Sequence, residues 1–232
     1  MTLTAEQTSA RGLRESLPGL LSLALASCVA VTTEMLPIGL LPEIGTTFAV
    51  ADSVTGLLVS LYAVMVATLA VPLTVATSRF ARKPLLLTTL ACYALSSALV
   101  AAAPSFAIVA VGRTLGGVTH ALFFSLVIGY SPRLVSGAHV GRALALAGSG
   151  ASAGLVLGVP LLTSFGAAAG WRASFAALAV LSVLTFVLVT RLLPRVDHEP
   201  MSTRHFSGGG RQVAICQRRL CGGVRVPRGA SQ

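Results

Sequence analysis

Long apolar stretches separated by short polar breaks dominate the first five-sixths of the chain. A helix of about 18 or more mostly apolar residues is long enough to cross the ~30 Å hydrocarbon core of a bilayer. The pattern predicts an all-α, polytopic membrane protein with six transmembrane helices, at residues 17–42, 54–77, 84–103, 106–130, 141–165 and 171–193. These helices form one domain, 17–194, between an N-terminal arm, 1–16, and a basic tail, 195–232.

Composition and charge agree with lipid as the solvent. The chain is 54% hydrophobic and only 10% charged, whereas soluble domains are about 25% charged. A net charge of +10 in a soluble protein would point to nucleic acid. Here the basic residues lie in short breaks and in the tail, without interleaved aromatic residues, so the bilayer and not a nucleic acid is the expected partner.

The distribution of Lys and Arg predicts the orientation. The arm, the second and fourth breaks and the segment after the sixth helix are basic, whereas the first break is acidic, the third is uncharged and the fifth has only Arg172 at its edge. Because Lys and Arg accumulate in cytoplasmic loops, this alternation predicts that both termini are cytoplasmic.

A weak internal repeat relates the two halves of the helical domain. Residues 69–74, in the second predicted helix, resemble residues 157–163, in the fifth. Two copies of three helices have opposite orientations, as in many transporters. The sequence therefore predicts two inverted three-helix repeats.

Glu34 is the first candidate for chemistry, because it is the only acidic residue inside a predicted span. A carboxylate at membrane depth is costly to insert and tends to mark a proton or cation path. The alternative is a glutamate at the membrane rim, since Glu34 lies about eight residues from the predicted outer boundary.

Arg113 is the second candidate, a lone cation eight residues into the fourth predicted helix. At 1.5 Å per residue, Glu34 and Arg113 both lie ~12 Å below the outer end, a depth at which the two charges could interact. The alternative is an arginine that fixes helix packing through backbone carbonyls. His120 lies seven residues further on the same face, and a structural role is the simpler interpretation for it.

Two further motifs lie in the fifth helix and the second break. Gly150, Gly154 and Gly158 recur every four residues before Pro160. Such spacing predicts close helix packing, and the proline could add a hinge. Ser78, Arg79, Arg82 and Lys83 occupy a short cytoplasmic turn. They either only orient the chain or act as a latch on neighbouring helix ends, whose dipoles favour cations.

The sequence has none of the short motifs expected of an enzyme, a metal site or a phosphate-binding loop. The spacing of its four cysteines matches no common zinc pattern. We therefore expect neither catalysis nor a cofactor.

Several segments together resemble the major facilitator superfamily, specifically its bacterial drug:proton antiporter and sugar efflux branch. The segments are 33–44, 78–83, 113–117, 154–160 and 170–175, and they occur in the order of that branch's motifs. The resemblance implies a bacterial inner-membrane protein with a substrate cavity near Glu34 and Arg113. It also implies proton-coupled efflux of small molecules, such as drugs or sugars, by alternating access.

The chain departs from that family in two ways. Thr74 and Ser78 replace a glycine and an aspartate of the loop motif, and only the N-terminal six of twelve helices are present. Transport would then need a second six-helix half or a homodimer, and the alternative function is a non-transporting scaffold or partner subunit. The tail has seven arginines and a triple glycine. It is a native tail, the start of a central loop or, as its composition favours, an out-of-frame segment.

Overall fold

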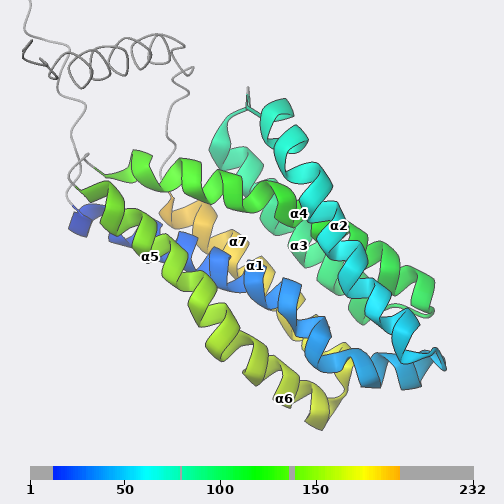
Figure 1. The fold of residues 1–232 in the computed structure, drawn as a ribbon. Coiled ribbons are helices and arrows are strands. Elements are labelled where there is room, and N and C mark those ends of the chain that lie inside the picture. The colour runs from blue at the N-terminus through cyan, green and yellow to red at the C-terminus, as the bar shows by residue number, and fades with distance from the viewer. Residues whose placement is uncertain (1–12, 79, 136–138, 194–232) are drawn as a thin grey trace, which may run out of the picture. The chain divides into compact units, whose positions relative to one another are not determined.

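The described part of the chain is entirely helical. A computed structural model describes residues 13–78, 80–135 and 139–193, and contains no strand in these ranges. The elements are α1 (Leu13–Phe48), α2 (Asp52–Ala76), α3 (Arg82–Ala101), α4 (Phe106–Tyr130), η1 (Ser131–Leu134), α5 (Val140–Ala153), η3 (Gly154–Gly158), α6 (Val159–Ala169) and α7 (Trp171–Leu192) (Figure 1).

Six spans in these ranges are long and apolar enough to cross a membrane, as the sequence predicts. The first four spans and the sixth are single helices. The fifth span, Val140–Ala169, consists of α5, η3 and α6 in succession. The N-terminal arm up to residue 12, Arg79, and the tail from residue 194 lie outside the described residues.

The first helix is longer than the apolar pattern indicates. We predicted an end at residue 42, but α1 continues to Phe48 and contains Pro18, Pro37 and Pro42. A proline removes one N–H and disturbs only the turn before it, and neighbouring helices support the bend. The helix ends where Ala49 adopts a φ of 52°, the left-handed region that stops an α-helix.

Side-chain contacts at one end of the bundle join the three breaks that have few basic residues. Trp171 donates a hydrogen bond from Nε1 to Thr47 Oγ1 (2.9 Å), and Arg172 donates to the carbonyl of Ala103 (3.1 Å). Phe48 packs on the ring of Phe106. These contacts connect the ends of α1, α3 and α6–α7 and the start of α4.

The opposite end brings together the segments that we predicted to be cytoplasmic. Ser16 Oγ donates to the carbonyl of Leu134, and Lys83 Nζ donates to the carbonyl of Thr190 at 3.2 Å. Gly19 lies against Leu193. The spans therefore alternate in direction, as the charge pattern requires.

The pairing of spans obeys the predicted repeat. The first span packs on the fifth as the fourth packs on the second, and the third packs on the sixth. The first also packs on the sixth as the fourth packs on the third. Exchanging spans one to three with spans four to six maps the first–fifth pair onto the second–fourth pair and the first–sixth pair onto the third–fourth pair. It leaves the third–sixth pair in place, as expected of two inverted three-helix repeats.

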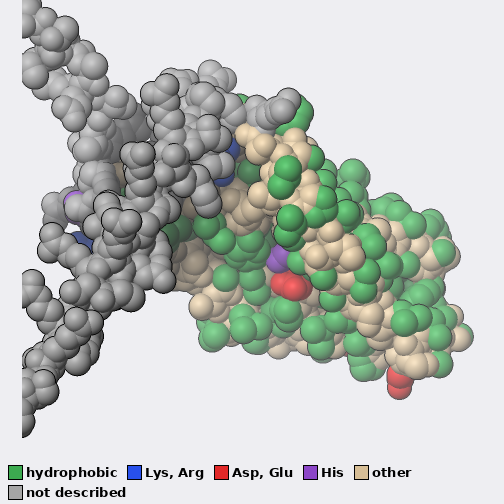
Figure 2. All heavy atoms as spheres, turned by 45° about the horizontal axis from the view of Figure 1, so that its top comes forward, with side chains coloured by type: hydrophobic (Ala, Val, Ile, Leu, Met, Phe, Trp, Pro, Cys, Tyr) green, Lys and Arg blue, Asp and Glu red, His purple; other side chains and the backbone are tan. Residues whose placement is uncertain are grey.

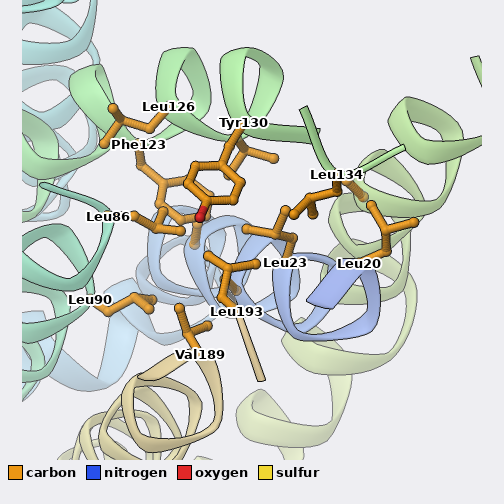
Figure 3. Close-up of a cluster of buried hydrophobic side chains, with 14 of the residues drawn as sticks. Leu20, Leu23, Leu86, Leu90, Phe123, Leu126, Tyr130, Leu134, Val189 and Leu193 are labelled. Carbon is orange, nitrogen blue, oxygen red and sulfur yellow. The ribbon is translucent and has the colours of Figure 1, made fainter. Parts of the chain in front are cut away.

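Two apolar clusters fill the interior. The cluster in Figure 3 lies toward the end that contains Lys83, and its labelled members come from α1, α3, α4, η1, α7 and the residue after it: Leu20, Leu23, Leu86, Leu90, Phe123, Leu126, Tyr130, Leu134, Val189 and Leu193. The second lies toward Trp171 and includes Leu36, Leu40, Ile44 and Phe175. On α1 and α4, a layer of polar side chains separates the two clusters.

Burial is uneven among the spans. The first and fourth are the most buried, whereas the second and fifth are the least. The second and fifth spans expose large apolar side chains, which include Leu57, Val71, Leu157 and Leu161. Such surfaces suit lipid or further helices and do not suit water.

Candidate functional site

The polar layer between the two clusters is built from four helices. α1 contributes Glu34, α2 Tyr62, α3 Tyr93, and α4 both Arg113 and His120. The seven residues between Arg113 and His120 are about two turns, so both side chains leave the same face of α4. The structure thus brings together the two sequence candidates, Glu34 and Arg113, and adds three aromatic residues.

Arg113 is held by the backbone of α1. Its guanidinium donates from Nη1 to the carbonyl of Thr33 (2.7 Å) and from Nη2 to the carbonyl of Glu34 (3.2 Å). The cation also lies 4.2 Å from the centroid of the Tyr62 ring, a favourable cation–π distance. With 1% of its surface exposed, Arg113 matches the packing alternative and does not pair with the Glu34 carboxylate.

The Glu34 carboxylate faces a histidine. Its Oε2 lies 3.4 Å from Nε2 of His120, and 29% of the Glu34 side chain is exposed. Figure 2 shows an acidic and a histidine side chain next to each other on a surface of hydrophobic and neutral atoms. Glu34 therefore lies in the interior of α1 (Leu13–Phe48), and its carboxylate is partly accessible.

His120, for which the sequence favoured a structural role, lies against the Glu34 carboxylate. Its Nδ1 lies 3.0 Å from the Tyr93 hydroxyl, so both ring nitrogens have a polar partner. The rings of Tyr62 and Phe124 flank it, with centroid distances of 5.6 Å and 5.1 Å. Its spacing from Arg113 was a usable signal, since it places the two on one face with Glu34 opposite.

The predicted glycine motif forms the seam between α1 and the fifth span. A Cβ added at Gly150 would lie 1.8 Å from the carbonyl oxygen of Ala24, and one at Gly154 would lie 2.5 Å from that of Cys28. At Gly158 it would lie 2.2 Å from Thr32 Oγ1. At Gly150 and Gly154 the two backbones approach each other directly, whereas at Gly158 the neighbour is the Thr32 side chain.

Pro160 follows a local widening of the helix. Because it has no N–H, the i to i−4 bond to Val156 is missing. Residues Gly154–Gly158 form a π-turn, in which the N–H of Val159 bonds to the carbonyl of Gly154. Such π-turns are common at functional sites.

The basic loop residues contact the ends of other helices. Lys83 Nζ donates to the carbonyls of Thr190 and Leu193 at the C-terminal end of α7. The Arg82 guanidinium lies against Gly129, in the last turn of α4. Ser78 Oγ bonds only to its own helix in the contacts seen here, at the carbonyl of Val75 (2.7 Å). The two cations thus lie where helix dipoles are negative.

The described residues contain no group of three side chains that could hold a metal ion. What the geometry offers instead is a partly accessible carboxylate beside an imidazole, held among apolar helices.

The fold and this site define a polytopic membrane protein of the transporter type. The chain belongs to the Major Facilitator Superfamily, whose model matches residues 23–226. That match includes much of the segment that we predicted to be a separate tail.

Curated relatives support the predicted drug and sugar efflux branch. A probable sugar efflux transporter of Mannheimia succiniciproducens is 32% identical over 76% of this chain and 45% of the relative. A chloramphenicol efflux pump of Mycobacterium tuberculosis is 38% identical over 65% of this chain and 36% of the relative. The chain thus spans less than half the length of these relatives, and both are named as transporters.

Solved structures confirm the fold. A bacterial homologue of the human lysosomal transporter Spinster, in an inward-facing conformation, is similar with a TM-score of 0.70 and 14% identity, over 90% of this chain and 50% of that chain. A peptide transporter has a TM-score of 0.68 at 11% identity, over 91% and 47%. At such identities the likeness concerns the fold alone.

Proposed function

We propose that this chain supplies one half of an efflux transporter that exchanges small molecules, such as drugs or sugars, for protons by alternating access. The observation that carries the proposal is Glu34, a carboxylate at the middle of α1 that is 29% exposed beside His120. A carboxylate inside a membrane span is costly to insert, and such residues usually have a function. The names of the curated relatives support the substrate classes, sugars and chloramphenicol-like drugs.

Proton exchange at Glu34 would change the charge of the polar layer. With the carboxylate ionised, its charge and that of Arg113 cancel; with it protonated, the layer is cationic. A substrate that binds better to one of these states is linked to the proton by their difference in affinity. Outward movement of substrate is then driven by inward movement of the proton.

The second half of the cavity comes from another six-helix unit. The apolar surfaces of α2 and the fifth span leave room for helix contacts, and alternating access requires one unit to rock against another around the site. A second polypeptide or a homodimer would provide that unit. In the bacterial inner membrane, both termini would be cytoplasmic, as the positive-inside pattern predicts.

Two structural devices would control the motion. The basic loop, with Lys83 and Arg82 on the ends of α7 and α4, would latch the cytoplasmic side, and Arg79 and Ser78 belong to the same motif. The π-turn before Pro160 would act as a hinge in the fifth span.

Transport across vesicles tests the proposal. The chain is joined to the second half of the M. tuberculosis relative, and inverted membrane vesicles are acidified inside. We expect accumulation of radiolabelled chloramphenicol or arabinose that stops when the pH gradient is collapsed, and no accumulation with the chain alone.

Each outcome separates a different part of the proposal. Gradient-driven accumulation by the chain alone would show that it needs no other polypeptide and would leave a homodimer as the source of the second unit. Absence of transport in both cases, with correct insertion and a maintained gradient, would favour the non-transporting scaffold or partner subunit.

A further inference from the structure

We propose that Tyr93 and His120 form a fixed hydrogen-bonded pair that presents an Nε2–H group to Glu34 and thereby holds its carboxylate in the ionised form. This inference deepens the proposed function, because it assumes that Glu34 is the group that exchanges the proton. It makes His120 and Tyr93 positioning residues that do not themselves carry the transported proton.

With Glu34 ionised and His120 neutral, the two contacts of the imidazole fit one set of donors. An ionised carboxylate only accepts hydrogen bonds, so Nε2 of His120, 3.4 Å from Glu34 Oε2, must carry a hydrogen. In a neutral imidazole the other nitrogen is then an acceptor. Nδ1 therefore accepts from the Tyr93 hydroxyl at 3.0 Å, and the hydroxyl selects the tautomer.

The other ionisable side chains near Glu34 make their closest contacts with other groups. Arg113 donates to backbone carbonyls of α1 and lies over the Tyr62 ring, although its positive charge also attracts the Glu34 carboxylate. Cys28 contributes backbone atoms to the glycine seam, and Cys92 lies next to Tyr93 on α3. The fifth span has Arg142 only in its first turn, and α7 has Arg172 and Arg191 only near its two ends. Among the described residues His120 is the side chain that contacts the carboxylate.

His120 and Glu34 differ in how far their side chains are buried. The side chain of His120 is 7% exposed, whereas that of Glu34 is 29% exposed. A proton from the open side binds a carboxylate oxygen of Glu34 and leaves by the same route, while His120 keeps its Nε2 hydrogen. Protonation removes the charge that strengthens the N–H···O contact, so α1 and α4 are joined less tightly in the protonated state.

The tautomer of His120 is the direct test. The chain with ¹⁵N-labelled histidine is placed in phospholipid nanodiscs at pH 8, and the His120 signal is assigned by its loss in H120F. We expect the Nε2–H tautomer in the native chain and a mixture of tautomers in Y93F, which deletes only the hydroxyl. Y130F, which removes a buried hydroxyl elsewhere in α4, is the control and should leave the signal unchanged.

The second readout is the protonation of Glu34, followed as its carboxylic acid C=O band by infrared difference spectroscopy against E34Q. Loss of a hydrogen bond to the charged form favours the neutral acid. We therefore expect H120F and Y93F to bind the proton more tightly, with a midpoint moved upward by about one pH unit, a tenfold change in affinity.

Two results would overturn the inference: an Nδ1–H tautomer in the native chain, or an unchanged midpoint in Y93F. If H120F does not fold, the midpoint of Glu34 protonation in Y93F is sufficient to test the inference. Neither readout involves transport, so a lack of proton-driven movement in vesicles would reject the proposed function independently.

Discussion

The guanidinium of Arg113 contacts Glu34 at its main-chain carbonyl (Nη2–O, 3.2 Å), while the carboxylate of Glu34 turns to His120 (Oε2–Nε2, 3.4 Å). Arg113 thus fixes the backbone of α1, and His120 contacts the carboxylate of Glu34. This separation lets the protonation of Glu34 change without breaking the contact that holds α1 to α4.

Arg113 should be essential for stability and not replaceable by lysine. A planar guanidinium donates to two carbonyls at once, whereas an ammonium is a point charge. Since a hydrogen bond to a charged group contributes about 1.5–3 kcal/mol, R113K should lose roughly that much. Thermal unfolding in detergent, followed by the fluorescence of the single tryptophan, Trp171, measures it. R142K, at an exposed arginine near the start of α5 and far along the chain from Trp171, is the control and should differ little from the native chain.

Replacing Glu34 by glutamine should uncouple transport from the proton. The amide keeps the volume and the polar contact but cannot exchange a proton. In the two-half transporter described above, E34Q should abolish gradient-driven accumulation yet retain substrate exchange, with no dependence on pH. D52N removes an exposed carboxylate at the start of α2 and should retain coupling. Full coupling in E34Q would exclude Glu34 as the proton site.

The glycine seam should reject even one methyl group. G150A places a Cβ 1.8 Å from the Ala24 carbonyl oxygen, whereas G148A, two residues away, meets nothing within 4 Å. Overpacking costs about 1–3 kcal/mol, so G150A should unfold at a clearly lower temperature and G148A near the native one. Equal stability of the two variants would contradict the seam.

Lys83 should stabilise the C-terminal end of α7. K83M keeps the aliphatic stem and removes the donor to Thr190 and Leu193. We expect faster amide hydrogen exchange confined to the last turns of α7. R142Q removes a cation from the same end of the bundle, on an exposed position of α5, and should leave α7 unchanged. Identical amide hydrogen exchange in K83M and the native chain would mean that the basic loop only orients the protein in the membrane.

Topology is tested by labelling single cysteines in a chain whose native cysteines are replaced by serine. S105C, in the uncharged third break, should react with a membrane-impermeant maleimide in intact cells. S78C, in the basic second break, should react only after permeabilisation. The reverse pattern would invert the orientation, and equal reaction would contradict an even alternation of the spans.

Apolar runs are long enough that each of the six spans could be predicted from sequence with only boundary errors. The largest error was the end of α1, because the apolar run ends at Pro42, before Glu43, although the helix continues to Phe48. A proline inside a span removes one backbone hydrogen bond, and packing against neighbouring helices can compensate for that loss. Such packing cannot be read from a local sequence pattern.

The site was predictable only in part for a similar reason. Glu34 and Arg113 were identifiable because charges at depth are rare, and the sequence placed them at one depth. The direction in which each side chain points depends on the rotation of α1 and α4 about their axes. That rotation depends on how α1 and α4 pack on the other helices, so the pairing of Glu34 with His120 emerged only from the assembled bundle.

The seam between α1 and the fifth span also limits how the molecule can move. Gly150 and Gly154 lie directly on main-chain carbonyls of α1, so a slide of either helix would bring a bulkier neighbouring residue against that backbone. α1 and α5 must therefore travel as one rigid body, while bending at the π-turn and rocking at softer boundaries of the bundle remain open to the rest of the fifth span.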